Sequence, residues 1–461
     1  MRAHEAGALH GDLGSRGPAW LRTPDDVNHL VPQLWPRNVA RDATGTLAVG
    51  GLTAGALAEE FGTPAYVLDE GDLRSRCRDF RAAFPDQDVY YAGKAFLCRA
   101  VVRVIAEEGL HLDVCTGGEL RTALAAGMPA ERIGFHGNNK SVAELTRAVD
   151  AGVGRIIVDS FDEIDRLTGI ARERGVRPKV LVRVTVGVEA HTHEFIATAH
   201  EDQKFGFSLA GGAAAEAAFR IIDEDVLDLR GLHSHIGSQI FDASGFEVSA
   251  RRVLGLQAQI RDARGVELPE LDLGGGFGIA YTTQDDPATP QDLSKRLNKI
   301  VDSECAALSL AVPHLSVEPG RAIIGPAVFT LYEVGTVKDV DGIRTYVSVD
   351  GGMSDNIRTA LYDASYSATI ASRSSDATPI LARVVGKHCE SGDIVVKDEF
   401  LPADVQPGDL LAVPGTGAYC RSMASNYNHV PRPPVVAVRD GKARVIVRRE
   451  TEDDLLALDV G

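Results

Sequence analysis

The sequence predicts a (β/α)8 TIM barrel followed by a C-terminal all-β domain. Short apolar segments alternate with helix-like stretches eight times in succession, which is the pattern of parallel βα units. These units extend over about 250 residues, the usual size of such a barrel. After Gly325 the helical signal becomes scarce, and short strands joined by Pro, Gly and Asp turns follow. An open doubly wound sheet is the alternative, but consecutive units with no switch point favour a closed barrel.

The expected domains follow from these patterns of predicted strands and helices. Residues 1–29 are rich in Gly, Ala, Arg and Pro without periodicity, and we expect a mobile tail. Residues 30–64 include a predicted helix over Leu52–Phe61. We expect them to join residues 326–461 in the β domain, a sandwich or barrel, and to supply a strand. The (β/α)8 barrel is expected over residues 65–325.

Each predicted element rests on an apolar run or on a helical period. The barrel strands are expected at Val89–Ala92, Leu110–Cys115, Ile133–His136, Ile156–Asp159, Val180–Val186, Leu229–Ile236, Leu271–Leu273 and Leu315–Val317. The helices between them are expected at Phe96–Glu108, Gly118–Ala126, Val142–Ala151, Asp162–Gly175, Ala213–Ile222, Phe246–Gly265 and Leu293–Leu310. The later strands are expected at Val328–Val337, Thr345–Val349, Leu381–Val385, Asp393–Val396, Leu410–Val413 and Ala443–Arg448.

Composition excludes several classes of protein. The net charge of −17 argues against a nucleic-acid partner, because phosphate backbones require clustered Lys and Arg. No apolar run is long enough to span a bilayer, and the N-terminus lacks the apolar region of a signal peptide. The six cysteines are scattered and form no CxxC pair, as in reduced cytosolic enzymes. We expect a soluble, cytoplasmic protein with no membrane or nucleic-acid partner.

Lys94 follows the first counted strand, in the stretch VYYAGKA. A lysine in a tight apolar neck is a candidate Schiff-base nucleophile, because desolvation disfavours the charged amine. Taken alone, it is better explained as a surface lysine. Its neighbours in the barrel decide between these readings.

The other predicted strands also end in polar residues, and the carboxyl ends of the strands are where barrel enzymes place their active sites. These residues are Asp113, His136, His233, His235, the Gly274–Gly276 run, Glu318 and Arg321. Such repeated placement favours a catalytic role for Lys94.

Three motifs in this set suggest particular chemistry. The GGG turn of residues 274–276 can approach a phosphate closely, although it lacks the GxGxxG dinucleotide pattern. His233 and His235 form an HxH pair typical of some metal hydrolases, with His191, His193, Glu194 and His200 as further candidate ligands. We favour a lid or a polar surface for the loop of residues 189–202, and ring stacking for His235. In EPGR, Glu318 can pair with a ring nitrogen and Arg321 with a phosphate or carboxylate, although a surface ion pair is the simpler reading.

Together these motifs resemble the fold-type III pyridoxal-phosphate decarboxylases of the alanine-racemase barrel class, and within them the diaminopimelate decarboxylases. The resemblance covers nearly the whole chain after about residue 30. It is carried by YAGKA (91–95), DVCTGGEL (113–120), FHGNNKS (135–141), GLHSHIGSQ (231–239), DLGGGFG (272–278), EPGR (318–321), DGGMSDNIR (350–358), GKHCESGD (386–393) and GTGAY (415–419). Phe96 and the Cys115–Thr116 pair depart from the usual family residues.

The resemblance implies pyridoxal 5'-phosphate as cofactor, bound covalently by Lys94. His235 would stack on its ring, and Glu318 would pair with its pyridine nitrogen, which favours decarboxylation over racemisation. The phosphate would be bound by Ser238, Gly274, Gly275, Gly276 and Tyr419. Asp113 and Arg321 complete the expected cofactor site, and no metal is expected.

The same resemblance implies decarboxylation of meso-2,6-diaminopimelate to L-lysine and CO2, the last step of bacterial lysine synthesis. Arg321, Arg358, Tyr362, Glu390 and Tyr419 would bind the substrate, whose distal carboxylate suits an arginine. Cys389 would protonate the product carbanion. Cys389 and Glu390 would come from the partner subunit of a homodimer. The alternatives are an ornithine- or arginine-type decarboxylase, a non-enzymatic pyridoxal-phosphate-binding protein and, last, a metal hydrolase.

Overall fold

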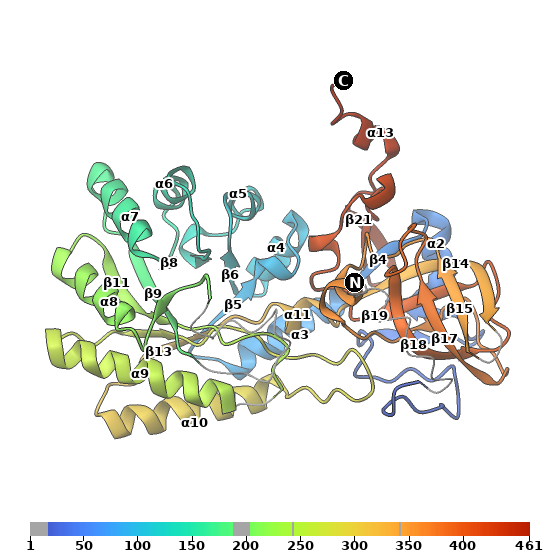
Figure 1. Ribbon diagram of the computed structural model, residues 1–461, viewed down its shortest axis with the longest axis horizontal. Helices are drawn as coiled ribbons and strands as arrows, with labels where there is room; N and C mark the ends of the chain where they lie inside the picture. Colours follow the sequence, from blue (N-terminus) through green and yellow to red (C-terminus); the bar gives the residue numbers. More distant parts are fainter. Residues whose placement is uncertain (1–16, 188–202, 242–243, 341–342) are drawn as a thin grey trace, which may run out of the picture. The chain divides into compact units, whose positions relative to one another are not determined.

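The computed structural model describes residues 17–187, 203–241, 244–340 and 343–461, and it divides into two compact units (Figure 1). Unit 1 comprises residues 1–75, 279–286 and 324–461, and unit 2 comprises residues 76–278 and 287–323. Each unit is considered by itself below. The described helices include none that is both long and apolar enough to cross a membrane.

Unit 2 is a closed parallel barrel of eight strands, which confirms the predicted fold class. The strands are β5 (Asp88–Ala92), β6 (His111–Val114), β7 (Ile133–Phe135), β8 (Arg155–Val158), β9 (Lys179–Thr185), β11 (Asp228–His233), β12 (Glu270–Asp272) and β13 (His314–Val317). They pair in the order β9-β11-β12-β13-β5-β6-β7-β8, and β8 pairs with β9 to close the ring. A two-residue strand, β10 (Phe207–Ser208), pairs with β9.

The barrel helices lie outside the ring of strands (Figure 1). They are α4 (Arg99–Glu107), α5 (Gly117–Ala125), α6 (Val142–Ala151), α7 (Phe161–Arg174), α8 (Ala213–Glu224), α9 (Ser244–Arg264) and α10 (Pro290–Leu308). Four of them begin at a Ser or Thr whose side chain accepts a hydrogen bond from the first turn, namely Thr116, Ser141, Ser160 and Thr289. Such caps satisfy backbone N–H groups that have no partner within the helix, and they fix where each loop meets its helix.

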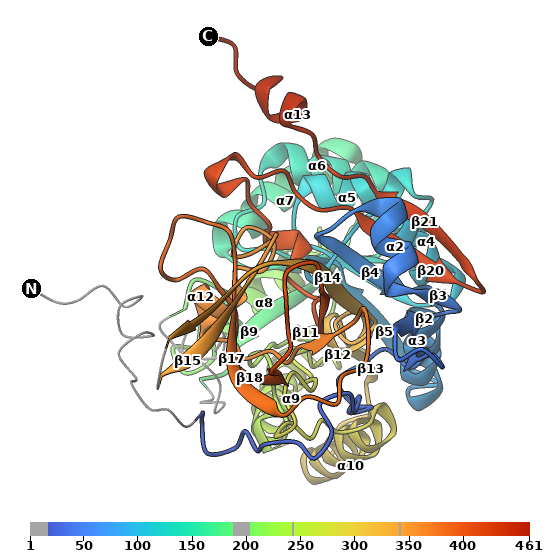
Figure 2. The same cartoon turned by 90° about the vertical axis from the view of Figure 1, so that its right-hand side faces the viewer.

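Unit 1 is built on a mixed, mostly antiparallel sheet around the long strand β14 (Val328–Val340), and Figure 2 shows its strands β15, β17 and β18 side by side. Its other strands are β1 (Val39–Arg41), β2 (Leu47–Val49), β3 (Leu52–Thr53), β4 (Ala65–Asp69), β15 (Arg344–Val349), β16 (Thr369–Ile370), β17 (Pro379–Val385), β18 (Ile394–Pro402), β19 (Leu410–Pro414), β20 (Val435–Arg439) and β21 (Lys442–Val447). The first half of β14 pairs with β4 on one side and β19 on the other. Its second half pairs with β15.

The core of unit 1 is apolar and includes residues from both ends of the chain. Trp35 packs against Phe329, with ring centroids 6.1 Å apart, and Val67 and Val436 are buried in the same cluster. Helix α2 (Ala54–Phe61) adds Leu57. The segment before the barrel is therefore part of the unit-1 core.

Several boundaries differ from the expected ones, and residues 279–286 and 324–325 of the expected barrel fall in unit 1. Residues 65–75 fall in unit 1 rather than in the barrel, because β4 pairs with β14 and β20 there. Part of the expected tail is also held: the Asn28 side chain accepts a hydrogen bond from Ser375 N and donates one to Ser375 O, both at 2.8 Å. Residues 1–16 lie outside the described residues.

Strand β4, strand β20 and helix α3 (Glu70–Ala83) were not predicted. Strand β4 is a short apolar segment directly followed by α3, so it lacks the turn that marked the other strands.

Candidate active site

Lys94 lies immediately after β5, in a single 3-10 turn over Gly93–Ala95. A side chain at position 93 would come within 2.7 Å of the Asp113 carbonyl oxygen, so glycine allows the ends of β5 and β6 to approach. The Lys94 side chain itself is exposed, whereas Gly93 and Ala95 are buried. The expectation of a desolvated lysine in an apolar neck is therefore wrong for this chain alone, although its place at the carboxyl end of the first barrel strand is as predicted.

Three buried side chains meet at the same end of the barrel. Nε2 of His136 lies 3.3 Å from Oε1 of Glu318, and Nε2 of His233 lies 3.0 Å from the same oxygen. The two imidazole rings meet edge to face, with centroids 5.0 Å apart. Asp113 joins them through its Oδ1, 3.1 Å from Nε2 of His136. The end residues of β6, β7, β11 and β13 thus form one polar cluster.

Burial and mutual repulsion set the charges in this cluster. Burial lowers the pKa of His136 to about 4, and that of His233 also to about 4. Burial alone would raise the pKa of the Glu318 carboxyl, but attraction to the three nearby histidines holds it below its ordinary range. At pH 7 Glu318 is therefore ionised beside neutral imidazoles, which add no positive charge to the cluster.

The pKa values of the neighbouring carboxyls Asp113 and Asp272 shift in the opposite direction to that of Glu318. Burial, followed by repulsion from Glu318, raises the pKa of Asp113 and of Asp272 well above the ordinary value. Two nearby buried carboxyls cannot both ionise cheaply, so the charge remains on the one with basic neighbours. Glu318 is thus the fixed negative charge of this cluster.

The glycine turn after β12 is packed tightly against two neighbouring loops. A side chain at Gly274 would come within 2.6 Å of the Ser234 carbonyl oxygen. One at Gly275 would come within 2.2 Å of the Glu318 carbonyl oxygen, and one at Gly276 within 2.3 Å of the Gly237 carbonyl oxygen. Gly274 N donates to Asp272 Oδ1 at 2.8 Å, and Glu318 N donates to Gly274 O at 2.9 Å. The turn is therefore rigid and leaves no room for side chains.

His235 belongs to this turn rather than to the histidine–glutamate cluster. Its Nδ1 accepts a hydrogen bond of 3.2 Å from Gly275 N, which leaves the ring proton on Nε2 when the imidazole is neutral. Burial and the Lys94 charge lower its pKa well below the ordinary value. A neutral, oriented imidazole suits a ring-stacking role.

Arg321 and Ser238 are also brought together, because Arg321 Nη2 donates to Ser238 Oγ at 2.9 Å. Arg321 is buried and Ser238 half-buried. Both were predicted to bind an anion, and together they offer a guanidinium and a hydroxyl. The barrel therefore gathers nearly all of the predicted cofactor-site residues, with Tyr419 belonging to unit 1.

The remaining predicted residues lie in unit 1. Arg358 and Tyr362 begin and end the short helix α12 (Arg358–Tyr362), four residues apart and so on one face. Cys389 and Glu390 are exposed, and Cys389 N donates to Asn428 Oδ1 at 3.1 Å. Tyr419 is half-buried and has a left-handed backbone, with φ of 68°.

Sequence reasoning missed several partners of these residues. Tyr366 and Tyr281 pack against Arg358, Cys420 contacts Tyr366, and Asp272 accepts a hydrogen bond from the glycine turn. His136 was noted at a strand end but was given no role. None of these residues belongs to a sequence motif that signals a role, so only their contacts in the folded protein show that they are part of the site.

A cation could be bound by His136, His233 and Glu318, whose ligand atoms all lie within 4.8 Å of one another. This differs from the predicted alternative, in which His233 paired with His235, since His235 Nδ1 already accepts from Gly275 N. The loop of residues 189–202 lies outside the described residues.

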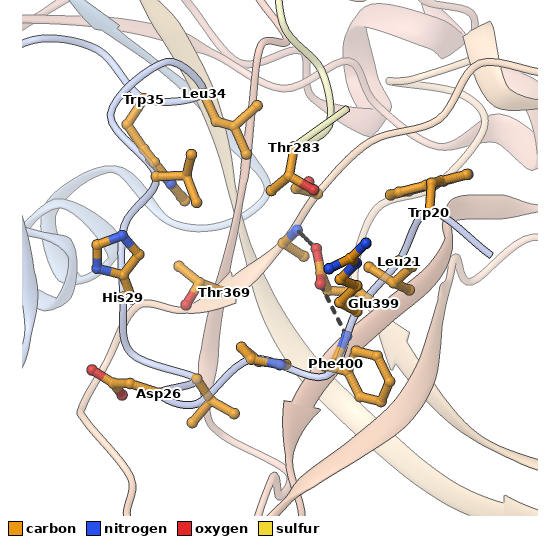
Figure 3. A pocket seen from close by; sticks show the side chains of 16 residues that line it. Trp20, Leu21, Asp26, His29, Leu34, Trp35, Thr283, Thr369, Glu399 and Phe400 are labelled. Carbon is orange, nitrogen blue, oxygen red and sulfur yellow. Dashed lines mark hydrogen bonds between the residues drawn. The ribbon is translucent and has the colours of Figure 1, made fainter. Parts of the chain in front are cut away.

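Unit 1 also contains a cavity of about 130 Å³, shown in Figure 3. Its walls include Trp20, Leu21 and Trp35 from the N-terminal segment and Glu399 from β18. The Glu399 carboxylate accepts hydrogen bonds from Ala368 N (3.0 Å) and Phe400 N (2.9 Å). None of the predicted site residues lines this cavity.

The donor set at the barrel end fits a pyridoxal phosphate. Oε1 of Glu318 is buried and has no well-directed hydrogen bond within the described residues, so it can accept one from a protonated ring nitrogen. Gly274–Gly276, with Arg321 and Ser238, provide a rigid turn and cationic and hydroxyl donors for a phosphate. Lys94 supplies an exposed amine at the same end.

Comparison with known proteins agrees with this chemistry. The family model of the pyridoxal-dependent decarboxylase, pyridoxal binding domain, matches residues 70–325. Diaminopimelate decarboxylase of Mycobacterium tuberculosis (strain H37Rv) is 59% identical and aligns over 95% of this chain and 100% of its own length. The enzyme of the same name from Bacillus subtilis is 47% identical and aligns over 90% of this chain and 95% of its own length.

Solved structures show the same relationship. Diaminopimelate decarboxylase of M. jannaschii in complex with L-lysine superposes with a TM-score of 0.86 at 31% identity, covering 92% of this chain and 98% of that one. The Helicobacter pylori enzyme with L-lysine gives a TM-score of 0.80 at 29% identity, and the match covers 88% of this chain and 98% of that one. With its closed barrel and its buried glutamate at the end of the last strand, the chain belongs to the pyridoxal-dependent decarboxylases, in the diaminopimelate decarboxylase family.

Proposed function

We propose that this enzyme uses pyridoxal 5'-phosphate to decarboxylate meso-2,6-diaminopimelate to L-lysine and CO2, as the last step of lysine synthesis. The observation that carries this proposal is the ionised Glu318 beside neutral His136 and His233 at the end of the barrel. The family relationship supports the substrate, since the relatives at 59% and 47% identity carry that activity in their names.

Residues of the barrel, together with Tyr419 of unit 1, would bind the cofactor. Lys94 would hold it covalently, Glu318 would accept from its ring nitrogen, and His235 would lie against its ring. Ser238, Tyr419 and the Gly274–Gly276 turn would bind its phosphate, with Arg321 and Asp113 nearby. When bound, pyridoxal phosphate supplies a protonated pyridine ring that accepts the electron pair released as CO2 leaves.

Glu318 contributes by keeping a negative charge where that ring nitrogen would lie. A carboxylate stabilises the proton on the nitrogen, whereas a cationic side chain would remove it. His136 and His233 lie 3.3 and 3.0 Å from Glu318 Oε1, and as neutral groups they do not cancel its charge.

Substrate recognition is assigned to Arg321, Arg358, Tyr362, Glu390 and Tyr419. A substrate with an amine and a carboxylate at its far end suits a paired acid and arginine, so Glu390 would bind the ammonium and Arg358 the carboxylate. Cys389 would donate the proton that replaces CO2. The exposure of Cys389 and Glu390 in the isolated chain supports their acting in the site of a partner subunit within a homodimer.

We also place the enzyme in the cytoplasm, which its six scattered cysteines, with no CxxC pair among them, support.

The proposal is tested by measuring CO2 and lysine release from meso-diaminopimelate with and without added pyridoxal phosphate. We expect a yellow wild-type protein that is active with cofactor, and a Lys94→Ala variant that lacks both the cofactor absorbance and turnover. A colourless wild type unable to take up the cofactor would overturn the proposal. Activity that persists without the cofactor and disappears with chelators would instead indicate a metal hydrolase.

The substrate assignment is tested by comparing diaminopimelate with ornithine. We expect turnover of diaminopimelate to exceed that of ornithine by orders of magnitude. Arg358→Ala should reduce only the former, because ornithine has no distal carboxylate. Preferred turnover of ornithine would identify an ornithine-type decarboxylase instead.

A further inference from the structure

Arg358 is a buried cation whose charge is not neutralised within unit 1. Its residue is 6% exposed, and it forms no ion pair in the part of the chain that the structure describes. Its Nε is buried and makes no hydrogen bond there. Burying a charge without a counterion is costly, so such a group marks a place where an anionic ligand is expected.

Two tyrosine rings surround the guanidinium without neutralising it. Its central carbon lies 4.9 Å from the ring centroid of Tyr281 and 5.7 Å from that of Tyr366. The two rings meet edge to face, with centroids 5.1 Å apart. Aromatic faces attract a cation but carry no net charge. The guanidinium is therefore held in place and still able to bind a carboxylate.

The Tyr366 hydroxyl fixes the orientation of the guanidinium. Arg358 Nη1 donates to Tyr366 Oη at 2.6 Å. Burial raises the pKa of Tyr366 well above its ordinary value, so the hydroxyl is neutral and keeps its own proton. Because arginine has no acceptor, this bond must use the tyrosine oxygen as acceptor and leaves the tyrosine proton for another partner.

That partner is Cys420. Its Sγ lies 3.6 Å from the Tyr366 Oη and donates in turn to Asn356 Oδ1 at 3.5 Å. Asn356 Oδ1 also accepts from the backbone N of Arg358 at 3.3 Å. The hydrogen bonds therefore form a closed path that starts at the Arg358 guanidinium, passes through the Tyr366 hydroxyl, the Cys420 thiol and the Asn356 amide oxygen, and ends at the Arg358 backbone N–H. Each member is buried, and the single protons of the Tyr366 hydroxyl and the Cys420 thiol are both used within this network.

We propose that Tyr366 is a positioning residue that gives the enzyme its preference for substrates with a second carboxylate. Its hydroxyl holds one arm of Arg358, so that the remaining N–H groups form a fixed, preorganised donor set for that carboxylate. Without this bond the side chain could adopt several rotamers, and binding would have to order it. The inference rests on the proposed function, specifically on the binding of the distal carboxylate by Arg358.

The test is Tyr366→Phe, which keeps the ring and removes the hydroxyl. We expect the KM for meso-diaminopimelate to rise about three- to tenfold, because binding would then have to order the Arg358 side chain. The kcat should change less than about twofold, because no reacting atom is touched. Any slow turnover of ornithine should keep its KM, since ornithine has no distal carboxylate.

Tyr66→Phe is the matched control. Tyr66 is an equally buried tyrosine of unit 1, and its hydroxyl donates to Asp355 O rather than to the Arg358 network. Both variants lose a buried hydroxyl and should lose similar thermal stability, but Tyr66→Phe should keep the wild-type KM.

An unchanged KM in a folded Tyr366→Phe enzyme, or an equal rise in KM in Tyr66→Phe, would overturn the inference. Failure of the proposed function would be seen differently, as a wild-type protein that releases no CO2 from diaminopimelate.

Discussion

At the residue scale, the unusual feature of the site is that its histidines are kept neutral by burial. A histidine that titrates normally would be half charged near pH 6.5 and would then compete with the cofactor ring for the Glu318 carboxylate. With a pKa of about 4, His136 and His233 stay neutral wherever the enzyme is expected to work. We therefore expect neither histidine to produce a limb in the pH profile of kcat between pH 5 and 9.

The same burial has a consequence for stability. The unfolded chain takes up protons on these histidines near pH 6.5, whereas the folded chain does so only near pH 4. Between these values the unfolded state binds more protons, so stability falls as the pH falls. We expect each histidine to lower the free energy of unfolding by up to roughly 3 kcal/mol by pH 4.

Chemical denaturation at pH 7, 6, 5 and 4 measures this loss. In His233→Gln the loss between pH 6.5 and 4 should be smaller than in the wild type, because glutamine does not titrate. Parallel pH curves for the two proteins would contradict the expected pKa.

The strand-end residues could be predicted because a barrel places the carboxyl ends of its strands together. Lys94, Asp113, His136, His233 and Glu318 needed only that rule and their positions in the sequence. Their pairing could not be predicted, because a distance of 3.0 Å between His233 and Glu318 depends on side-chain packing across the barrel. The network of Tyr366 and Cys420 was missed for the same reason.

At the scale of elements, a buried ion pair joins neighbouring βα units. Lys140, in the loop between β7 and α6, is 2% exposed, and its Nζ donates to Glu163 Oε1 at 2.7 Å. It also donates to Gly137 O at 2.6 Å and to Ile157 O at 2.9 Å, the latter in β8. One amine therefore holds the β7 loop, strand β8 and helix α7 together.

We expect Lys140→Met to destabilise the protein by about 3–5 kcal/mol, because it leaves the Glu163 carboxylate buried without a cationic partner. The free energy of unfolding from urea denaturation measures the loss. The double variant Lys140→Met/Glu163→Gln should recover much of it, since the uncompensated charge is then gone. A single variant as stable as the wild type would show that the pair contributes no net stability.

The barrel elements were predicted better than those of unit 1. Parallel strands buried on both faces are continuous apolar runs between helices, and these are easy to delimit. In unit 1, β4 pairs in parallel with β20 and antiparallel with β14, strands far away in sequence. A short segment with such distant partners carries little local information about its sheet, and this explains why the boundary near residue 65 differed.

At the scale of the whole molecule, the proposed homodimer makes a prediction about mixtures of inactive variants. If Cys389 and Glu390 act in the site of the partner subunit, the Lys94→Ala and Cys389→Ala changes of a mixed dimer both fall in the same one of its two sites. The other site would then contain both intact groups.

Mixing the two inactive proteins and allowing subunits to exchange should restore about a quarter of the wild-type activity, since half of the dimers are mixed and each has one intact site. Size-exclusion chromatography with light scattering establishes the dimer independently. A mixture as inactive as its components, despite demonstrated exchange, would place Cys389 and Lys94 of one chain in the same site.

The closure of the barrel has a further consequence, for the time at which the site comes into being during synthesis. Strand β13 pairs with β5, so the last strand of the ring lies beside the first, with Ser316 opposite Asp88 and Val317 opposite Val89. Lys94 follows the first of these strands and Glu318 the last. A ribosome-bound chain that has not yet exposed β13 therefore possesses the lysine but lacks the glutamate and the neighbouring strand. Because such distant pairing is a late event in folding, cofactor capture is expected to follow the completion of the barrel rather than to guide it.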